Sequence, residues 1–322
     1  MKKKILIIIV KILDLLFSPL TILSILWFKI IRKINIGRMN ISRNLFNYFG
    51  LLPIHDHYYE PLINPKKHLL STLKNDRKLL GIDFNVDKQK ELIDSFNYND
   101  ELLEFPVNNI NNNKYFYNNG FFKSGDSEYL YNLIRKFKPK KIIEIGSGFS
   151  TRMIINSINK NKEEDINYTC DVKCIEPYRF LSLEKLPVQI IKEKVEMVDM
   201  KLFKILDEDD FVFIDSSHII RPQGDVLYEI QNILPYLNKG VLIHFHDIFT
   251  PKDYPEKWII NHRLWNEQYL LESFLTFNNH YEIIGSLNYL KHHHWDLLSS
   301  KCPILSRDIQ REPSSFWIRK IK

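Results

Sequence analysis

Short apolar segments alternate with helical patterns from residue 126 onward, and this alternation constrains the fold more than any other feature. The segment KKIIEIGSG, residues 140–148, is an apolar run of strand length that ends in glycines. Predicted strands lie within residues 140–148, 172–177, 188–195, 210–215, 240–247, 281–288 and 314–320. Predicted helices lie within residues 126–139, 149–160 and 222–237.

Apolar strands that alternate with helices form a parallel sheet covered on both faces. We therefore predict an α/β fold, with a Rossmann-like, doubly wound, mostly parallel seven-stranded sheet. Ligands bind such sheets beyond the carboxyl ends of the strands. The polar residues that close the predicted strands should gather there: Glu144, Glu176, Asp215, His246 and Asp247.

The sequence EIGSGFST places Gly146 and Gly148 in a tight turn between a strand and a helix. Glycine lets the backbone adopt positive φ and lets a ligand approach closely. A nicotinamide-binding fingerprint requires a third glycine at position 151, where this chain has Thr151. An NAD-linked oxidoreductase is therefore disfavoured.

This order of acid, glycine turn and second acid resembles the class I S-adenosylmethionine-dependent methyltransferases. The resemblance covers residues 126–319. It implies that the turn holds the methionine part of the cofactor and that the second acid holds the ribose. The cofactor-binding residues implied in this way are Glu144, Gly146, Ser147, Gly148, Glu176 and, on the adenine side, Glu196.

The segments FIDSSH and HFHDIF resemble the O-methyltransferases of the catechol type and of the sugar or macrolide type. That resemblance implies catalytic roles for Asp215 and for His218, the latter as the base that takes the acceptor's proton. It also implies a divalent metal, magnesium or manganese, bound by Asp215, His246 and Asp247. Two alternatives stay open: Asp215 contacts the cofactor without a metal, and His218 is a loop or capping residue.

Two further side-chain groups near these segments carry expectations of their own. His244 is expected to pack in the core, on the opposite face of the sheet from His246. Residues 246–258 are expected to cover the site as a loop in which Tyr254 and Trp258 stack on a ring-shaped acceptor.

Residues 1–33 form an apolar run with basic residues at both ends, interrupted by Lys11, Asp14 and Pro19. We expect a helix or helical hairpin that lies in the membrane interface. A membrane span and a helix packed on protein remain alternatives. A secretory signal is disfavoured, since no small-residue cleavage site follows. The predicted location is the cytoplasm, at the inner face of the membrane.

The predicted divisions are residues 1–36 (membrane-associating helix), 37–125 (extension or cap) and 126–322 (methyltransferase domain). The net charge of +6 is partly a feature of the N-terminus, so nucleic-acid binding is disfavoured. Three cysteines are too few for a disulfide framework. The sequence does not indicate an oligomeric state.

These observations favour an S-adenosylmethionine-dependent methyltransferase that acts on a hydroxyl of a sugar, a glycan or another small acceptor. A hydroxylase on the same fold and a membrane-attached binding protein with a degenerate fold remain alternatives. The presence of Glu144, Glu176, Asp215 and Asp247 together argues against the second alternative.

Overall fold

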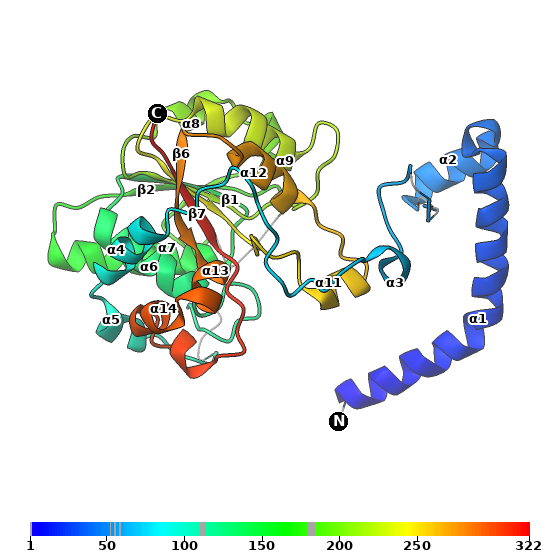
Figure 1. Cartoon of the computed structure of the whole chain (residues 1–322), viewed down its shortest axis with the longest axis horizontal. Helices are drawn as coiled ribbons and strands as arrows, with labels where there is room; N and C mark the ends of the chain where they lie inside the picture. Colours follow the sequence, from blue (N-terminus) through cyan, green and yellow to red (C-terminus); the bar gives the residue numbers. More distant parts are fainter. Residues whose placement is uncertain (1, 52, 55, 58, 110–113, 179–183) are drawn as a thin grey trace. The chain divides into compact units, whose positions relative to one another are not determined.

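The computed structural model describes residues 2–51, 53–54, 56–57, 59–109, 114–178 and 184–322. The chain divides into two compact units, Met1–Ser71 and Thr72–Lys322, and each unit is described by itself (Figure 1). The predicted divisions at residues 36 and 125 stay predictions.

The first unit contains one long helix followed by short ones: α1 (Lys2–Ile34), η1 (Ile36–Arg38), α2 (Asn40–Phe49) and α3 (Pro65–His68). Figure 1 shows α1 as a bent helix. Pro19 lies inside this helix, and proline removes a helical hydrogen bond. Apolar side chains are exposed on all sides of α1. By length and composition, Ile5–Ile34 is long and apolar enough to cross a membrane.

The second unit is built on one seven-stranded sheet with the strand order β3-β2-β1-β4-β5-β7-β6. All neighbouring strands from β3 to β5 pair in parallel, and β7 pairs antiparallel with both β5 and β6. The strands are β1 (Lys141–Ile145), β2 (Asp171–Ile175), β3 (Gln189–Ile191), β4 (Phe211–Ile214), β5 (Leu242–Phe245), β6 (Tyr281–Ser286) and β7 (Phe316–Lys320). This arrangement confirms the predicted Rossmann-like α/β fold.

Helices connect the strands and cover both faces of the sheet, as Figure 1 shows. Before and between β1 and β4 they are α4 (Val86–Asp94), α5 (Asn99–Leu103), α6 (Asp126–Phe137), α7 (Phe149–Glu164), η2 (Val195–Met197) and α8 (Lys201–Lys204). After β4 they are α9 (Asp225–Tyr228), η3 (Glu229–Ile233), α10 (Leu234–Tyr236), α11 (Glu256–Ile260), α12 (Glu267–Leu275), α13 (Leu287–His293), α14 (Trp295–Lys301) and η4 (Leu305–Arg307).

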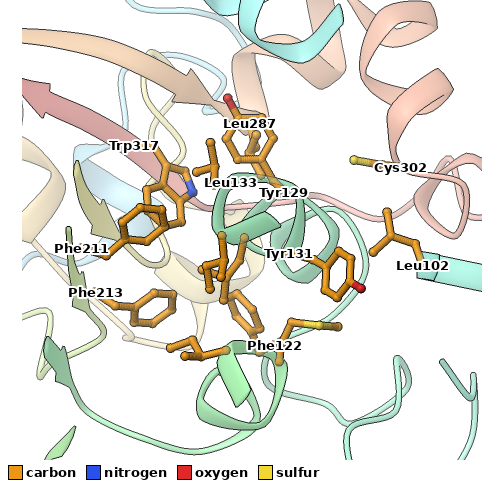
Figure 2. Packing of buried hydrophobic residues seen from close by; sticks show 14 of the residues in the cluster. Leu102, Phe122, Tyr129, Tyr131, Leu133, Phe211, Phe213, Leu287, Cys302 and Trp317 are labelled. Carbon is orange, nitrogen blue, oxygen red and sulfur yellow. The ribbon is translucent and has the colours of Figure 1, made fainter. Parts of the chain in front are cut away.

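Two apolar clusters, one on each face of the sheet, form the core. On one face, Phe211 and Phe213 of β4 lie with Trp317 of β7 in the same cluster as Tyr129 and Leu133 of α6 (Figure 2). On the other face, the alternate residues of the same strands pack against α8, α9, η3 and α12. Burial of both faces explains why these strands read as continuous apolar runs.

Residues 72–125 are part of the second unit, and several of their side chains belong to its core. Tyr115 and Tyr117 are fully buried. The Tyr115 hydroxyl donates to the carbonyl of Phe122 at 3.0 Å, and the Tyr117 hydroxyl donates to the carbonyl of Leu102 at 2.9 Å. Residues 110–113, within the Asn-rich segment 108–120, lie outside the described residues.

Two predicted elements differ from the observed ones in length or regularity. The third strand is only Gln189–Ile191, shorter than the predicted range 188–195, because the charged residues at 192–194 follow its apolar part. The helix predicted at 222–237 is divided into α9, the π-helical turn η3 and α10. Pro235 lies in α10 and has no amide hydrogen, so the preceding turn cannot continue a regular α-helical bond pattern.

Candidate functional site

The glycine turn after β1 lies directly against the end of β4. Gly146 has φ +76°, and a Cβ atom placed there would be 2.1 Å from the carbonyl oxygen of Asp215. The Asp215 amide donates to the carbonyl of Ile145 at 2.9 Å, so the two chain segments are also hydrogen-bonded. Glycine is required at position 146 both for its conformation and for this close approach.

Glu144 lies beneath the turn and is fully buried. One of its carboxylate oxygens accepts from Ser150 Oγ at 2.6 Å, and the other accepts from Thr151 Oγ1 at 2.7 Å. Burial raises the pKa of Glu144 to about 7, although these two hydrogen bonds oppose the shift. The side chain therefore supports the turn and the start of α7 from inside the protein.

Glu176 follows β2 and contacts the same turn from the other side. Its Oε2 atom accepts from the amide of Ser147 at 3.3 Å, and its Oε1 atom accepts from the amide of Tyr178 at 2.9 Å. A carboxylate has about four lone-pair positions, so these two bonds leave acceptor capacity for ligand hydroxyls. Glu196 lies in η2 and is half-buried.

A cavity of about 210 Å³ opens between the glycine turn and the end of β4. Ser147 Oγ is buried and has no hydrogen-bond partner within the described part of the chain. A Cβ atom at Gly148 would meet nothing within 4 Å, so the backbone there borders open space. The cavity is lined by Phe121, Phe122, Ser147, Gly148, Phe149, Ser150, Arg152 and Asp215.

His218 is held between two carboxylates. Its Nε2 atom lies 3.3 Å from Asp215 Oδ1, and its Nδ1 atom lies 2.7 Å from Glu267 Oε2. Burial alone would lower the pKa of His218, but the hydrogen bonds and charges of the two acids raise it well above its usual value. Burial raises the pKa of Asp215, but His246 and His218 oppose burial, and the pKa is lowered overall.

The comparison with known protein families decides what kind of domain this geometry belongs to. Residues 143–248 match the family model of a methyltransferase domain, and this range runs from β1 to just beyond β5. The chain carries a methyltransferase domain. The match agrees, over these residues, with the predicted resemblance to the class I S-adenosylmethionine-dependent methyltransferases.

Individual proteins also resemble this chain. An uncharacterized protein of Archaeoglobus fulgidus is 29% identical over 164 residues, which are 47% of this chain and 72% of the relative. The solved O-methyltransferase TomG of Streptomyces achromogenes, involved in tomaymycin synthesis, has 12% identity and a TM-score of 0.40 over 61% of this chain and 79% of TomG. An O-methyltransferase of Bacillus cereus has 11% identity and a TM-score of 0.36 over 73% and 91% of the two chains.

Asp215 and Asp247, two of the three predicted metal ligands, are each engaged by another protein side chain. Asp247 Oδ1 accepts from Ser314 Oγ at 3.0 Å and lies 3.7 Å from His246 Nε2, whereas Asp215 is paired with His218. Among the described residues, no three His, Cys, Asp or Glu side chains are arranged to hold a metal ion. The residues present do not fit a divalent metal.

Two expectations about the surroundings of the site are wrong. His244 and His246 lie on the same face of the sheet, with ring centroids 5.7 Å apart, because alternate residues of a strand point to the same side. His244 is nevertheless a core residue, as expected, and it donates to or accepts from Ser315 Oγ at 2.9 Å. Tyr254 is fully buried, so it does not offer a stacking surface to an acceptor.

The most important side chains that the sequence reasoning missed come from outside the matched range. Glu267 of α12 contacts His218, and the ring of Trp265 lies 4.1 Å from the His218 ring. Phe121 and Phe122 line the cavity from the segment that precedes α6. No local pattern marks these residues, since each reaches the site only through the tertiary fold.

Proposed function

We propose that this chain transfers the methyl group of S-adenosylmethionine to a hydroxyl of a sugar, a glycan or another small acceptor. The observation that carries the proposal is the meeting of the glycine turn and the Asp215 carboxylate at one cavity. A cofactor held on the turn is thus next to a carboxylate that can accept a hydrogen bond from an acceptor hydroxyl.

The residues around the cavity fit the cofactor. The unpartnered Ser147 Oγ and the open backbone at Gly148 are available to its methionine part. The remaining acceptor positions of Glu176 suit the two ribose hydroxyls. We assign Glu144 a positioning role, because both of its oxygens are bonded to the start of α7. Glu196, in η2, is assigned to the adenine side by the resemblance.

The bound cofactor supplies an electrophilic methyl group on a sulfonium sulfur. A neutral hydroxyl is a poor nucleophile, so the protein must take its proton. The side chain of Asp215 is 37% exposed and lines the cavity, whereas that of His218 is only 6% exposed and both of its ring nitrogens face carboxylates. We therefore propose Asp215 as the group that meets the acceptor hydroxyl and His218 as its charged partner.

Calorimetric titration of the full chain with S-adenosylmethionine tests the proposal. We expect saturable binding that Glu176→Gln weakens by roughly tenfold, since a charge-assisted hydrogen bond to the ribose is lost. Glu193→Gln is the matched control, because Glu193 is exposed and its substitution removes the same charge. Absence of any binding by the unaltered chain would refute the methyltransferase assignment.

We also propose that α1 attaches the chain to the inner face of the membrane. The helix is apolar on all sides, and a helix of that kind is stable only in a protein core or in lipid. Basic residues stand at both ends of this apolar run, as in helices that lie on anionic membrane surfaces. We expect the chain to float with lipid vesicles and Leu15→Gln/Leu16→Gln to reduce the floating fraction severalfold; unchanged flotation argues against attachment through α1.

A further inference from the structure

Another cavity lies in the first unit, at the carboxyl end of the apolar helix α1, and it is lined mostly by charged residues. It has a volume of about 430 Å³ and is lined by Lys29, Arg32, Lys33, His57 and Glu60. Cavities that bind small ligands have volumes of roughly 300–1,000 Å³. Its three permanent cations exceed its single carboxylate, so it is electropositive.

Two of the three permanent cations of this cavity have no carboxylate partner in the described segments of the chain and are available to a ligand. Arg32 forms an ion pair with Glu60, which fixes the guanidinium at the wall. Lys29 and Lys33 are one helical turn apart, and neither forms an ion pair with any residue that the structure describes. Two adjacent, unpaired ammonium groups repel each other, and a bound anion relieves that repulsion.

The neighbouring helix α2 shows at which depth of a membrane this cavity would lie. Four of its apolar side chains, 51–82% exposed, follow the spacing i, i+4, i+7 and i+8 and thus share one face: Ile41, Leu45, Tyr48 and Phe49. Phe46 instead packs on Phe28 of α1, with ring centroids 5.5 Å apart. A short helix with one apolar face and two exposed aromatic rings is typical of the lipid–water boundary.

We infer that the cavity formed by Lys29, Arg32, Lys33 and His57 binds the phosphate of an anionic phospholipid. Arg and Lys are the side chains that recognise phosphate, and Arg does so with two parallel hydrogen bonds. The charges are complementary, and the cavity adjoins the helix that we propose to be in lipid. The inference rests on the membrane attachment proposed above and is independent of the methyl-transfer chemistry.

The test uses the full chain in nonionic detergent, titrated with dioctanoyl phosphatidylglycerol, dioctanoyl phosphatidylcholine and inorganic phosphate. We expect saturable binding of phosphatidylglycerol at least tenfold tighter than that of phosphatidylcholine. Lys29→Gln/Lys33→Gln should weaken it by roughly an order of magnitude, since each cation near a membrane surface contributes severalfold to binding of anionic lipid. Lys66→Gln/Lys74→Gln is the matched control, because both lysines are exposed and the charge loss is equal.

Equal binding of the two lipids, or an equal loss in the control variant, would overturn the headgroup site. Inorganic phosphate that binds as tightly as phosphatidylglycerol would show that a free anion, not a lipid, is the ligand. If Lys29→Gln/Lys33→Gln does not fold, His57→Ala should give a smaller loss of phosphatidylglycerol binding, and an unchanged affinity in that variant would count against the site. Vesicle flotation distinguishes failure of this site from failure of attachment through α1.

Discussion

At the scale of single residues, the site depends on contacts between side chains far apart in the sequence. The amides of Asn266 and Glu267 both donate to the carbonyl of His218, at 3.1 and 3.3 Å. Asn266 Oδ1 in turn accepts from the amide of Ile220, and Trp265 covers the imidazole. These contacts hold His218 in a left-handed conformation with φ +61°, which is uncommon for a residue other than glycine.

We predict that Glu267→Gln destabilises the fold and makes its stability less dependent on alkaline pH. Because the pKa of folded His218 is raised, its protonated form stabilises the fold fully below the unfolded pKa of about 6.5. That contribution is lost as the pH rises through the folded pKa. Removing the Glu267 charge lowers the folded pKa of His218, so the interval between its unfolded and folded pKa narrows and less stability is lost as the pH rises through it. The variant should be destabilised by roughly 2 kcal/mol near pH 6 and by less at higher pH.

Thermal unfolding followed by circular dichroism between about pH 6 and about pH 9 measures this effect. Glu256→Gln, on the exposed side of α11, is the control and should leave the pH dependence unchanged. Several other titratable groups lie around His218 and contribute a background: Asp215, Asp225, Glu229 and His246. Parallel curves for the unaltered chain and Glu267→Gln would contradict the prediction.

The sequence predicted the acids at the strand ends, because the apolar pattern marks each strand and the acid follows it directly. Asp215 and Glu176 follow buried strands, so the sheet brings them to one edge. Glu267 was not predictable in this way, since 49 residues separate it from His218 and α12 has no fixed register with β4. The hydroxyls of Ser150 and Thr151 donate to the carboxylate of Glu144 under the turn, and the cofactor contact predicted for Glu144 stays a prediction.

At the scale of elements, a buried arginine connects three helices of the second unit. Arg135 of α6 donates through Nε to Glu101 Oε2 at 2.8 Å and through Nη2 to Glu101 Oε1 at 3.0 Å, in α5. It also bonds Asn161 and Glu164 of α7. These bonds use every N–H donor of the guanidinium. The Arg135 side chain is fully buried, and its guanidinium lies 4.9 Å from the Tyr98 ring centroid.

We predict that Arg135→Ala destabilises the fold by about 2–4 kcal/mol, because it leaves two carboxylates and a buried amide without their partner. Lys136→Ala, on the exposed side of the same helix, should change stability by less than about 0.5 kcal/mol. Urea unfolding of both variants provides the comparison. An equal midpoint for Arg135→Ala and the unaltered chain would mean that the helices are held by apolar contacts alone.

The strands were predicted better than the helices for a physical reason. A strand buried on both faces carries its signal in every residue, as in Phe211–Ile214 and Leu242–Phe245. The segment 222–237 has helical periodicity throughout, yet Pro235 and the π-helical turn divide it. Periodicity reports which side of a segment is apolar, but it does not report the hydrogen bonds within the segment.

At the scale of the whole molecule, the two units differ in how they satisfy their apolar surface. The second unit buries its apolar side chains in two clusters on the faces of its sheet. The first unit leaves apolar side chains of α1 and α2 exposed. The amino-acid sequence indicated this contrast, since an apolar run of that length has no comparable partner segment.

We therefore predict that a chain reduced to residues 72–322 folds and is soluble. It should bind S-adenosylmethionine within about twofold of the affinity of the full chain, a difference of less than 0.5 kcal/mol, while losing vesicle flotation. Calorimetry and flotation on the same preparation provide the two measurements. Aggregation of the shortened chain, with loss of cofactor binding, would show that the second unit depends on the first.

The absence of a side chain at Gly146 has a mechanical consequence. The carbonyl of Asp215 occupies the space that a Cβ atom would fill, and the backbones are joined by the amide of Asp215. The turn and the end of β4 therefore move as one body, with no compressible side chain between them. A ligand that displaces the turn by a fraction of an ångström displaces the carboxylate of Asp215 with it, so occupancy of one half of the cavity is felt directly in the other half.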